Sequence, residues 1–313
     1  MQKINHVIDA IVRLEIQGAT NVAISAVTSF AEFAHRMCSK PYKEFLDQLN
    51  NVRDRILNTR PTEPAMRNGI NYLFALTRNK ELSLPELCEL MDTRAKQYIE
   101  LLQTSRAKIG RIGAKRILEG TTVMTHCHSS AVDAILIHTN KQGRTFQVIA
   151  TETRPLYQGR RTTKILLEHG IPVTLVVDSA MRWALRHFQP DIVLVGADVI
   201  TSTGAIVNKI GTKLLALAAK ELDVPFYSAS SLLKFDSLTT EGALSEIEER
   251  TPTEIWPDAP PTLTIRNPAF EVVSREFLDG YITEYGIWPP AMLPYIYATK
   301  FPEMIETVEE PIS

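Results

Sequence analysis

The second half of the sequence alternates short β-branched runs with amphipathic segments, and this alternation restricts the possible folds more than any other feature. The strand-like runs are Thr121–Thr125, Thr145–Thr151, Val173–Asp178, Ile192–Gly196, Val224–Ala229 and Thr262–Ile265. The segments of helical character are Ser130–His138, Thr162–His169, Ser179–His187 and Lys209–Leu222. Strands that alternate with helices at this spacing predict a parallel sheet with helical crossovers. The runs are almost continuously apolar, which predicts a sheet that is covered on both faces.

The first third of the sequence differs, because its apolar residues recur at helical spacing, as Ile4, Ile8 and Ile11 do. Prolines interrupt this pattern at Arg60-Pro-Thr-Glu-Pro64, and no strand-like alternation stands out. We therefore expect an α/β protein of two domains. An all-α domain over residues 1–115 precedes a Rossmann-like domain over residues 116–313, with helices on both faces of a parallel sheet.

Charge and cysteine content exclude several classes of protein. The 34 basic and 36 acidic residues give a net charge of -2, so there is no basic excess to drive nucleic-acid binding. Three cysteines, Cys38, Cys88 and Cys127, do not form a disulfide framework and fit a reducing interior. No apolar run predicts a signal peptide or a membrane span. We expect a soluble cytoplasmic protein.

Polar residues follow each of the first five predicted strands. The segments are Thr125–Ser130, Glu152–Arg154, Asp178–Ser179, Gly196–Asp198 and Ser228–Ser231, with Lys234 just beyond the last. The carboxyl ends of parallel strands lie at one edge of a sheet, and ligands of open α/β sheets bind there. The sequence therefore predicts a ligand site at this edge, with a thiol, carboxylates, hydroxyls and cationic groups.

Cys127 lies between a predicted strand and a helix that begins at Ser129 or Ser130, either of which can cap it. The dipole and free amides of a helix N-terminus stabilise a thiolate, so the pattern predicts a lowered pKa and a nucleophile or base. The alternative is an inert, buried cysteine. His126 and His128 suggest a metal site, but successive residues of an extended chain point to opposite faces, which disfavours it.

Asp198 follows an apolar strand and a glycine, so partial desolvation suits it to general acid or base work. The alternative is a carboxylate that caps a helix or lies in a loop. The loop Asn208-Lys-Ile-Gly-Thr212 leads toward a helix and can bind an anion at the helix N-terminus, with the charge of Lys209 added. A solvated helical lysine is the alternative for Lys209. These features favour a generic phosphate.

Four other polar features can be interpreted either as functional or as purely structural. The segment Gln17–Asn21 can present amides to an anion or simply interrupt a helix. Arg60 can bind substrate or lie on the surface. Glu152 and Arg154 can pair with each other, and Asp178 can cap the helix that follows it.

Several of these segments together resemble one superfamily. They are Gly196–Asp198, Asn208–Thr212, Glu152–Pro155 with Gln158–Gly159, Arg60–Thr62 and Asn267–Phe270. The superfamily contains ribose 1,5-bisphosphate isomerases, methylthioribose 1-phosphate isomerases and the α, β and δ regulatory subunits of the exchange factor for translation initiation. The resemblance extends from about Gln17 to Pro290. Gln17, where arginine is usual, and His128, where a smaller polar residue is usual, depart from it.

The resemblance implies an aldose–ketose isomerase that uses a cysteine and an aspartate for proton transfer, and these match Cys127 as base and Asp198 as acid. The compact length and Lys234-Phe235 are most similar to the ribose 1,5-bisphosphate isomerases, which form ribulose 1,5-bisphosphate. The implied substrate contacts are Gly18, Ala19, Thr20, Asn21, Arg60, Ser129, Ser130, Ala131, Asn208, Lys209 and Lys234.

Two other functions stay open within this resemblance: a non-catalytic regulatory subunit that binds nucleotide or sugar phosphate, and a methylthioribose 1-phosphate isomerase. The implied partner is a small phosphorylated sugar, without metal, redox cofactor, nucleic acid or membrane. The resemblance also implies a homo-oligomer, a dimer or a hexamer. A nucleotide activator such as AMP and a role in nucleotide salvage would fit it.

Overall fold

The computed structural model describes all residues except 1, 14, 17, 61–62, 240–247 and 305–313, and the chain forms two compact units. The helical unit comprises Met1–Thr104, Leu233–Phe235 and Ile296–Ser313. The sheet unit comprises Ser105–Leu232 and Asp236–Tyr295. The domain boundary suggested after residue 115 stays a prediction.

The helical unit contains α1 (Gln2–Val12), α2 (Ala19–Met37), α3 (Tyr42–Leu57), α4 (Pro64–Ala75), the first part of α5 (Leu84–Gly113) and the end of α10 (Leu293–Lys300). Ile4, Ile8 and Ile11 are buried, as their spacing predicts. The buried Tyr98 donates a hydrogen bond of 2.6 Å to the Ala65 carbonyl and so ties α5 to α4. No helix in the described part of the chain is long and apolar enough to cross a membrane.

The sheet unit is built on a sheet of seven strands in the order β11-β10-β7-β4-β1-β2-β3. The strands are β1 (Thr122–Thr125), β2 (Gln147–Thr151), β3 (Val173–Val176), β4 (Ile192–Val195), β7 (Phe226–Ala229), β10 (Gly280–Thr283) and β11 (Gly286–Trp288). All neighbours are parallel except β11, which pairs antiparallel with β10. The parallel strands bring their carboxyl ends to one edge.

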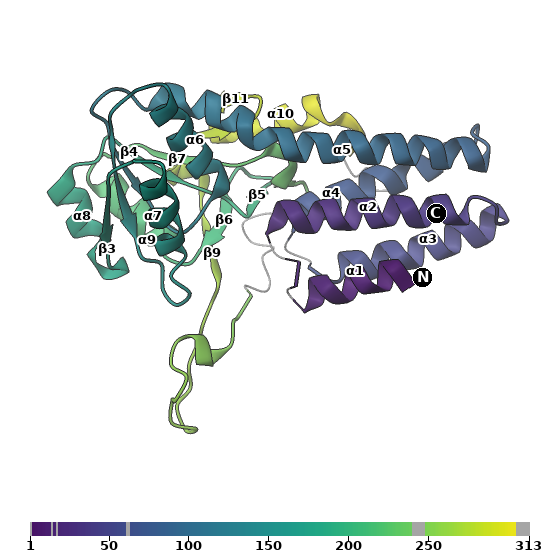
Figure 1. Ribbon diagram of the computed structural model, residues 1–313, viewed down its shortest axis with the longest axis horizontal. Helices are drawn as coiled ribbons and strands as arrows, with labels where there is room; N and C mark the ends of the chain where they lie inside the picture. The colour runs from purple at the N-terminus through teal and green to yellow at the C-terminus, as the bar shows by residue number, and fades with distance from the viewer. Residues whose placement is uncertain (1, 14, 17, 61–62, 240–247, 305–313) are drawn as a thin grey trace. The chain divides into compact units, whose positions relative to one another are not determined.

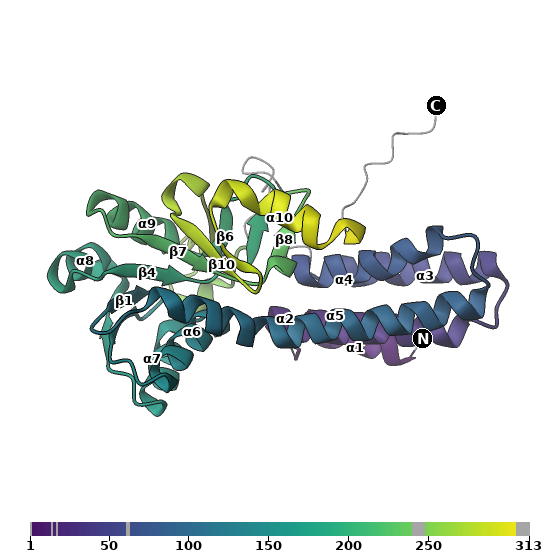
Figure 2. The same cartoon turned by 90° about the horizontal axis from the view of Figure 1, so that it is seen from above.

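Helices cover both faces of this sheet. They are α6 (Ser130–Lys141), α7 (Gln158–Glu168), α8 (Met181–Phe188) and α9 (Thr212–Glu221). Figure 2 shows α6 and α7 on one face and α8 and α9 on the other. Val132 of α6 and Leu166 of α7 join Val123 of β1 in one apolar core. The predicted fold class is confirmed.

A second group of strands was not predicted: β5 (Val199–Thr201), β6 (Ile206–Lys209) and β9 (Phe270–Val273) pair antiparallel, and β8 (Phe235–Asp236) is short. The predicted helix Lys209–Leu222 is therefore wrong at its start, because Lys209 ends β6. Gly211 takes a φ of 101°, a left-handed conformation open to glycine, and α9 begins only after it.

The predicted strand Thr262–Ile265 is also wrong. It lies in an arm that extends from the sheet unit (Figure 1), and its two sides meet where the Arg250 N–H donates to Asn267 O. Pro260 and Pro261 precede the segment and have no N–H to donate. A β-branched run without a pairing partner does not become a strand, because β-propensity depends on its neighbours.

Candidate active site

The ends of β1, β2 and β3 are joined by side-chain hydrogen bonds at the carboxyl edge of the sheet. His126 Nδ1 lies 2.6 Å from Thr151 Oγ1, which links β1 to β2. Asp178, just after β3, accepts hydrogen bonds from the backbone N–H groups of Thr153 (2.8 Å) and Arg154 (2.6 Å). Asp178 therefore orders the loop after β2, rather than only capping the helix that follows it.

Cys127 has a φ of 67°, the left-handed region that residues other than glycine rarely adopt. Two threonines hold it there. Its N–H donates to Thr153 Oγ1 (2.9 Å), and its carbonyl accepts from Thr162 Oγ1 (3.2 Å). Such a conformation costs about 1–3 kcal/mol and persists only where the surroundings determine it. The thiol residue is still partly exposed.

Burial raises the pKa of the Cys127 thiol to about 12. A hydrogen bond from the His128 backbone lowers this pKa, the Asp198 and Asp178 carboxylates raise it, and the Lys209 ammonium lowers it. The predicted lowering of the pKa is therefore wrong. The backbone of the helix start does favour the thiolate, but desolvation outweighs it.

Ser129 caps α6, since its hydroxyl accepts from the Val132 N–H at 3.5 Å; Ser130 and Ala131 form the first residues of the helix. Gly196 at the end of β4 lies directly against it. A Cβ at Gly196 would come within 2.7 Å of Ser129 Oγ, so only glycine lets the two segments approach this closely.

Asp198 lies between β4 and β5, where its N–H donates to Val207 O. The helix-cap alternative is wrong, because a strand follows. The negative charge of Asp198 raises the pKa of Cys127, which connects the two residues electrostatically.

Asn208 and Lys209 are the last residues of β6, and both are buried. Asn208 Nδ2 donates to Thr212 Oγ1 (3.0 Å), and Lys209 Nζ lies 4.7 Å from the centre of the Phe270 ring. The alternative of a solvated helical lysine is wrong. The charge of Lys209 instead acts on the pKa of both Cys127 and His126.

The remaining candidates belong to the helical unit. Gly18 caps α2 with a φ of 84°, and Ala19, Thr20 and Asn21 form its first turn. Arg60 forms an ion pair of 3.2 Å with Glu63, and Lys234 ends a short 3-10 helix. Gln17, Pro61 and Thr62 lie outside the described residues. The roles of Gly18–Asn21, Arg60 and Lys234 as substrate contacts stay predictions.

His126 is a structural residue at this edge. It is 2% exposed, and its Nε2 lies 2.9 Å from the Ile210 carbonyl, which can only accept. Nε2 therefore carries the proton, and Nδ1 accepts from the Thr151 hydroxyl. Burial lowers the pKa of His126, in keeping with a neutral ring. Within the described residues, no three or more His, Cys, Asp or Glu side chains are arranged so that they could hold a metal ion.

Sequence reasoning missed the two threonines that hold Cys127. Thr153 itself has a φ of 61°, and nothing in the letters Thr-Arg-Pro indicates a left-handed residue. Thr162 lies inside α7, which begins four residues earlier than the predicted start, at Gln158. Glu152 pairs with Arg160 at 2.8 Å, so the alternative in which it pairs with Arg154 is wrong.

His128 and Asp133 form a pair beside Cys127, in which Asp133 is buried and His128 is half-buried. Their Nδ1 and Oδ2 atoms are 3.3 Å apart, an ion-pair distance. Burial, however, lowers the pKa of His128 to about 4 and raises the pKa of Asp133 to about 7. Desolvation thus favours a neutral imidazole, and the contact is a hydrogen bond that its Nδ1–H donates to Asp133 Oδ2 rather than an ion pair.

The raised pKa of the buried Asp133 carboxyl predicts that the free energy of unfolding depends on pH. The pKa of Asp133 is 3.8 in the unfolded chain and about 7 in the folded protein. The protonated carboxyl therefore adds its full contribution to stability below pH 3.8, and this contribution is lost as the pH rises through 7. The variant Asp133→Asn cannot ionise. We expect its free energy of unfolding, relative to wild type, to increase by about 2–4 kcal/mol between about pH 4 and pH 8.

Urea unfolding across this pH range measures the difference. Asp258→Asn removes an exposed carboxylate of the sheet unit and is the matched control, for which we expect a constant difference. A difference for Asp133→Asn that does not change with pH would contradict the shifted ionisation.

The fold and the site define a class: two-unit α/β proteins with a thiol and a carboxylate at the carboxyl edge of a Rossmann-like sheet. The chain belongs to the Initiation factor 2 subunit family, whose model matches residues 15–290.

Among relatives, the chain is 41% identical to the ribose 1,5-bisphosphate isomerase of Archaeoglobus fulgidus, over 96% of this chain and 94% of that protein. It is 33% identical to the methylthioribose-1-phosphate isomerase of Pelotomaculum thermopropionicum, over 91% and 82%. Among solved structures, it matches the translation initiation factor eIF-2B of Pyrococcus horikoshii with a TM-score of 0.76 and 28% identity, covering 93% of this chain and 98% of that one.

Proposed function

We propose that this protein is a sugar-phosphate isomerase that converts ribose 1,5-bisphosphate to ribulose 1,5-bisphosphate. The relatives at 41% and 37% identity carry that name, over nearly the whole chain. The observation that carries the proposal is Cys127, which Thr153 and Thr162 hold at the sheet edge and whose pKa the charges of Asp198 and Lys209 shift. This edge offers a base, a second proton carrier and a cation together.

In the proposed reaction the furanose ring opens by cleavage of the C1–O4 bond, and O4 gains a proton. Cys127 then removes the proton from C2, which gives an enol-type intermediate. Asp198 moves the proton of the C2 hydroxyl as the ketone forms, and C1 gains a proton. The net change moves one hydrogen from C2 to C1 and the proton of the C2 hydroxyl to O4, so no oxidant or reductant is consumed.

The charges of Asp198 and Lys209 have opposite effects on the pKa of the base, Cys127: Asp198 raises it and Lys209 lowers it. The thiol must lose its proton to act, and its pKa of about 12 without substrate makes that costly. The Lys209 ammonium favours the thiolate. Buried cations and backbone donors also stabilise the oxyanion of an enolate most strongly where water is excluded. Lys209, 9% exposed, would serve the phosphate or this oxyanion.

Phosphorus NMR of the purified protein with α-ribose 1,5-bisphosphate tests the proposal, and 5-methylthioribose 1-phosphate serves as the competing substrate. Conversion of the bisphosphate with much the higher kcat/KM supports it. Conversion of the monophosphate alone would instead assign the methylthioribose 1-phosphate reaction, which relatives at 33–34% identity carry in their names.

A regulatory function is the second candidate, favoured by the likeness to eIF-2B structures. Cys127 and Asp198 argue for catalysis instead. No conversion of either sugar phosphate, together with capture of a translation factor, would favour the regulatory function. The homo-oligomer and the nucleotide activator stay predictions of the same resemblance.

A further inference from the structure

Thr153 and Thr162, from two separate segments, hold the backbone of Cys127 by hydrogen bonds, and we call these two bonds the clamp. The proposed chemistry does not use the side chain of Thr162. The N–H of Cys127 is held by Thr153 after β2. Its carbonyl is held by Thr162 of α7. Thr162 is 1% exposed, so water does not compete for this hydrogen bond. A left-handed cysteine depends on such restraints.

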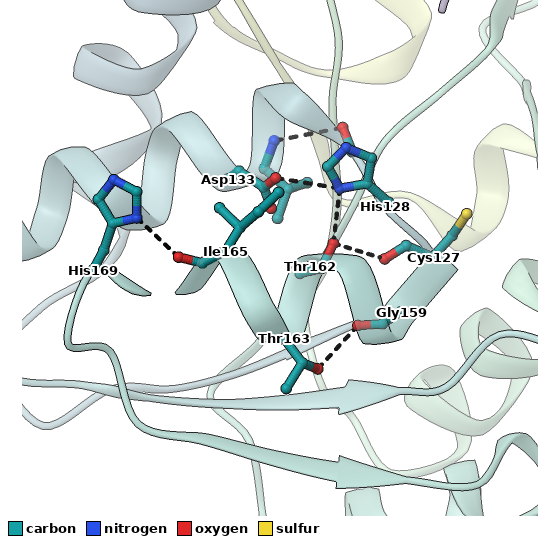
Figure 3. Close-up of polar contacts among 10 residues, drawn as sticks. Cys127, His128, Asp133, Gly159, Thr162, Thr163, Ile165 and His169 are labelled. Atoms are coloured by element: carbon teal, nitrogen blue, oxygen red, sulfur yellow. Dashed lines mark hydrogen bonds and ion pairs between the residues drawn. The ribbon is translucent and has the colours of Figure 1, made fainter. Parts of the chain in front are cut away.

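The hydroxyl of Thr162 is itself oriented. It has one proton, which it donates to the Cys127 carbonyl, so its oxygen accepts from another donor. His128 Nδ1 lies 3.1 Å away and supplies that donor. The same Nδ1 faces Asp133 Oδ2, which keeps the proton on this nitrogen when Asp133 is ionised. Figure 3 shows the chain of contacts from Asp133 through His128 and Thr162 to Cys127.

The direction of the thiol decides what this network can do. In Figure 3 the Cys127 carbonyl faces Thr162, whereas its sulfur points away from Thr162 and His128. The network therefore does not reach the reacting atoms through the sulfur. It acts on the backbone that determines where the sulfur lies.

We infer that Thr162 is a positioning residue for Cys127, and that His128 and Asp133 fix its hydroxyl for this purpose. The inference rests on the proposed function, since it assigns these residues to the orientation of the same thiol. Displacement of a reacting group by about 1 Å can cost about 10²-fold in rate. Loss of the clamp is therefore expected to affect kcat far more than KM.

The substitution Thr162→Val keeps the β-branched shape and removes the hydroxyl. We expect kcat for the isomerisation to fall by about 10- to 100-fold, with KM changed less than about twofold. Thr162→Ser retains the hydroxyl and is expected to stay near wild type. Thr163→Val is the matched control, because the neighbouring Thr163 hydroxyl donates only to Gly159 O within α7 (2.9 Å). Equal losses in Thr162→Val and Thr163→Val would overturn the inference.

The rate at which iodoacetamide alkylates Cys127, measured by peptide mass spectrometry, reports how firmly Thr162 holds the Cys127 backbone, and it needs no substrate. We expect Thr162→Val to raise the rate at Cys127 by about threefold or more, because the released thiol becomes more accessible. Cys38 and Cys88 in the same digest are internal references, and their rates are expected to stay constant. An unchanged rate at Cys127 would overturn the inference.

The two readouts separate this inference from the proposed function. If the wild-type protein isomerises neither sugar phosphate but Thr162→Val is still alkylated faster at Cys127, the proposed function is wrong and the inference about Thr162 stands. Should Thr162→Val fail to fold, as checked by thermal unfolding, His128→Phe removes the N–H that orients Thr162 and is expected to change the alkylation rate in the same direction. No change in His128→Phe would then overturn the inference.

Discussion

Replacement of Cys127 by serine is expected to lower kcat by about 10²–10⁴-fold, the usual contribution of a general base. A serine hydroxyl is a far weaker acid than a thiol, so the base of the proposed reaction is lost while the side-chain shape is kept. The backbone hydrogen bonds to Thr153 and Thr162 do not involve the sulfur and should persist. Initial rates of ribulose 1,5-bisphosphate formation measure the effect.

Cys38→Ser is the matched control, because Cys38 lies at the end of α2 in the helical unit and has no part in the proposed chemistry. Its rate is expected to equal that of wild type. The midpoint of thermal unfolding of Cys127→Ser is expected to stay within a few degrees of wild type. Activity of Cys127→Ser above about a tenth of wild type would rule out the thiol as the base.

Asp198→Asn is expected to lower kcat by about 10²–10⁴-fold as well, because an amide cannot carry a proton between the substrate oxygens. A second effect is visible without substrate. The Asp198 charge raises the pKa of Cys127, so its removal lowers that pKa and increases the fraction of thiolate. We therefore expect iodoacetamide to modify Cys127 faster in Asp198→Asn than in wild type.

Asp258→Asn is the control for both effects, because it removes an exposed carboxylate from the same unit. It should leave the rate of isomerisation and the rate of alkylation unchanged. If Asp198→Asn keeps full activity, Asp198 has no part in proton transfer. If iodoacetamide modifies Cys127 no faster in Asp198→Asn than in wild type, the charge of Asp198 does not raise the pKa of the thiol.

Five strands of the sheet, β1–β4 and β7, could be predicted because their sequences are almost continuously apolar, including that of β3, which lies at the edge and is partly exposed. The strands β6 and β9 could not, because polar residues stand among their apolar ones, as Asn208 and Lys209 do in β6 and Glu271 does in β9; β5 has only three residues. The turn that Gly211 makes after β6 decides where α9 begins, and its φ is set by the tertiary structure.

The gathering of polar residues at one edge of the sheet could be predicted, since the carboxyl ends of parallel strands share that edge. The protonation of Cys127 could not. Position beside a helix start indicated a lowered pKa, whereas burial, which only the packed structure determines, raises it. The left-handed conformation of Cys127 and its hold by Thr162 join segments 35 residues apart, a pairing that no local pattern contains.

The most direct test of the account follows isomerisation of α-ribose 1,5-bisphosphate in D₂O by proton NMR. A reaction in which a thiolate takes the C2 proton predicts ribulose 1,5-bisphosphate that carries solvent deuterium at C1. Two results would contradict the account: no product from the wild-type protein, which would end the proposed function, and product with the C2 hydrogen fully retained at C1 that forms equally fast in Cys127→Ser, which would indicate hydride transfer without Cys127 as the base.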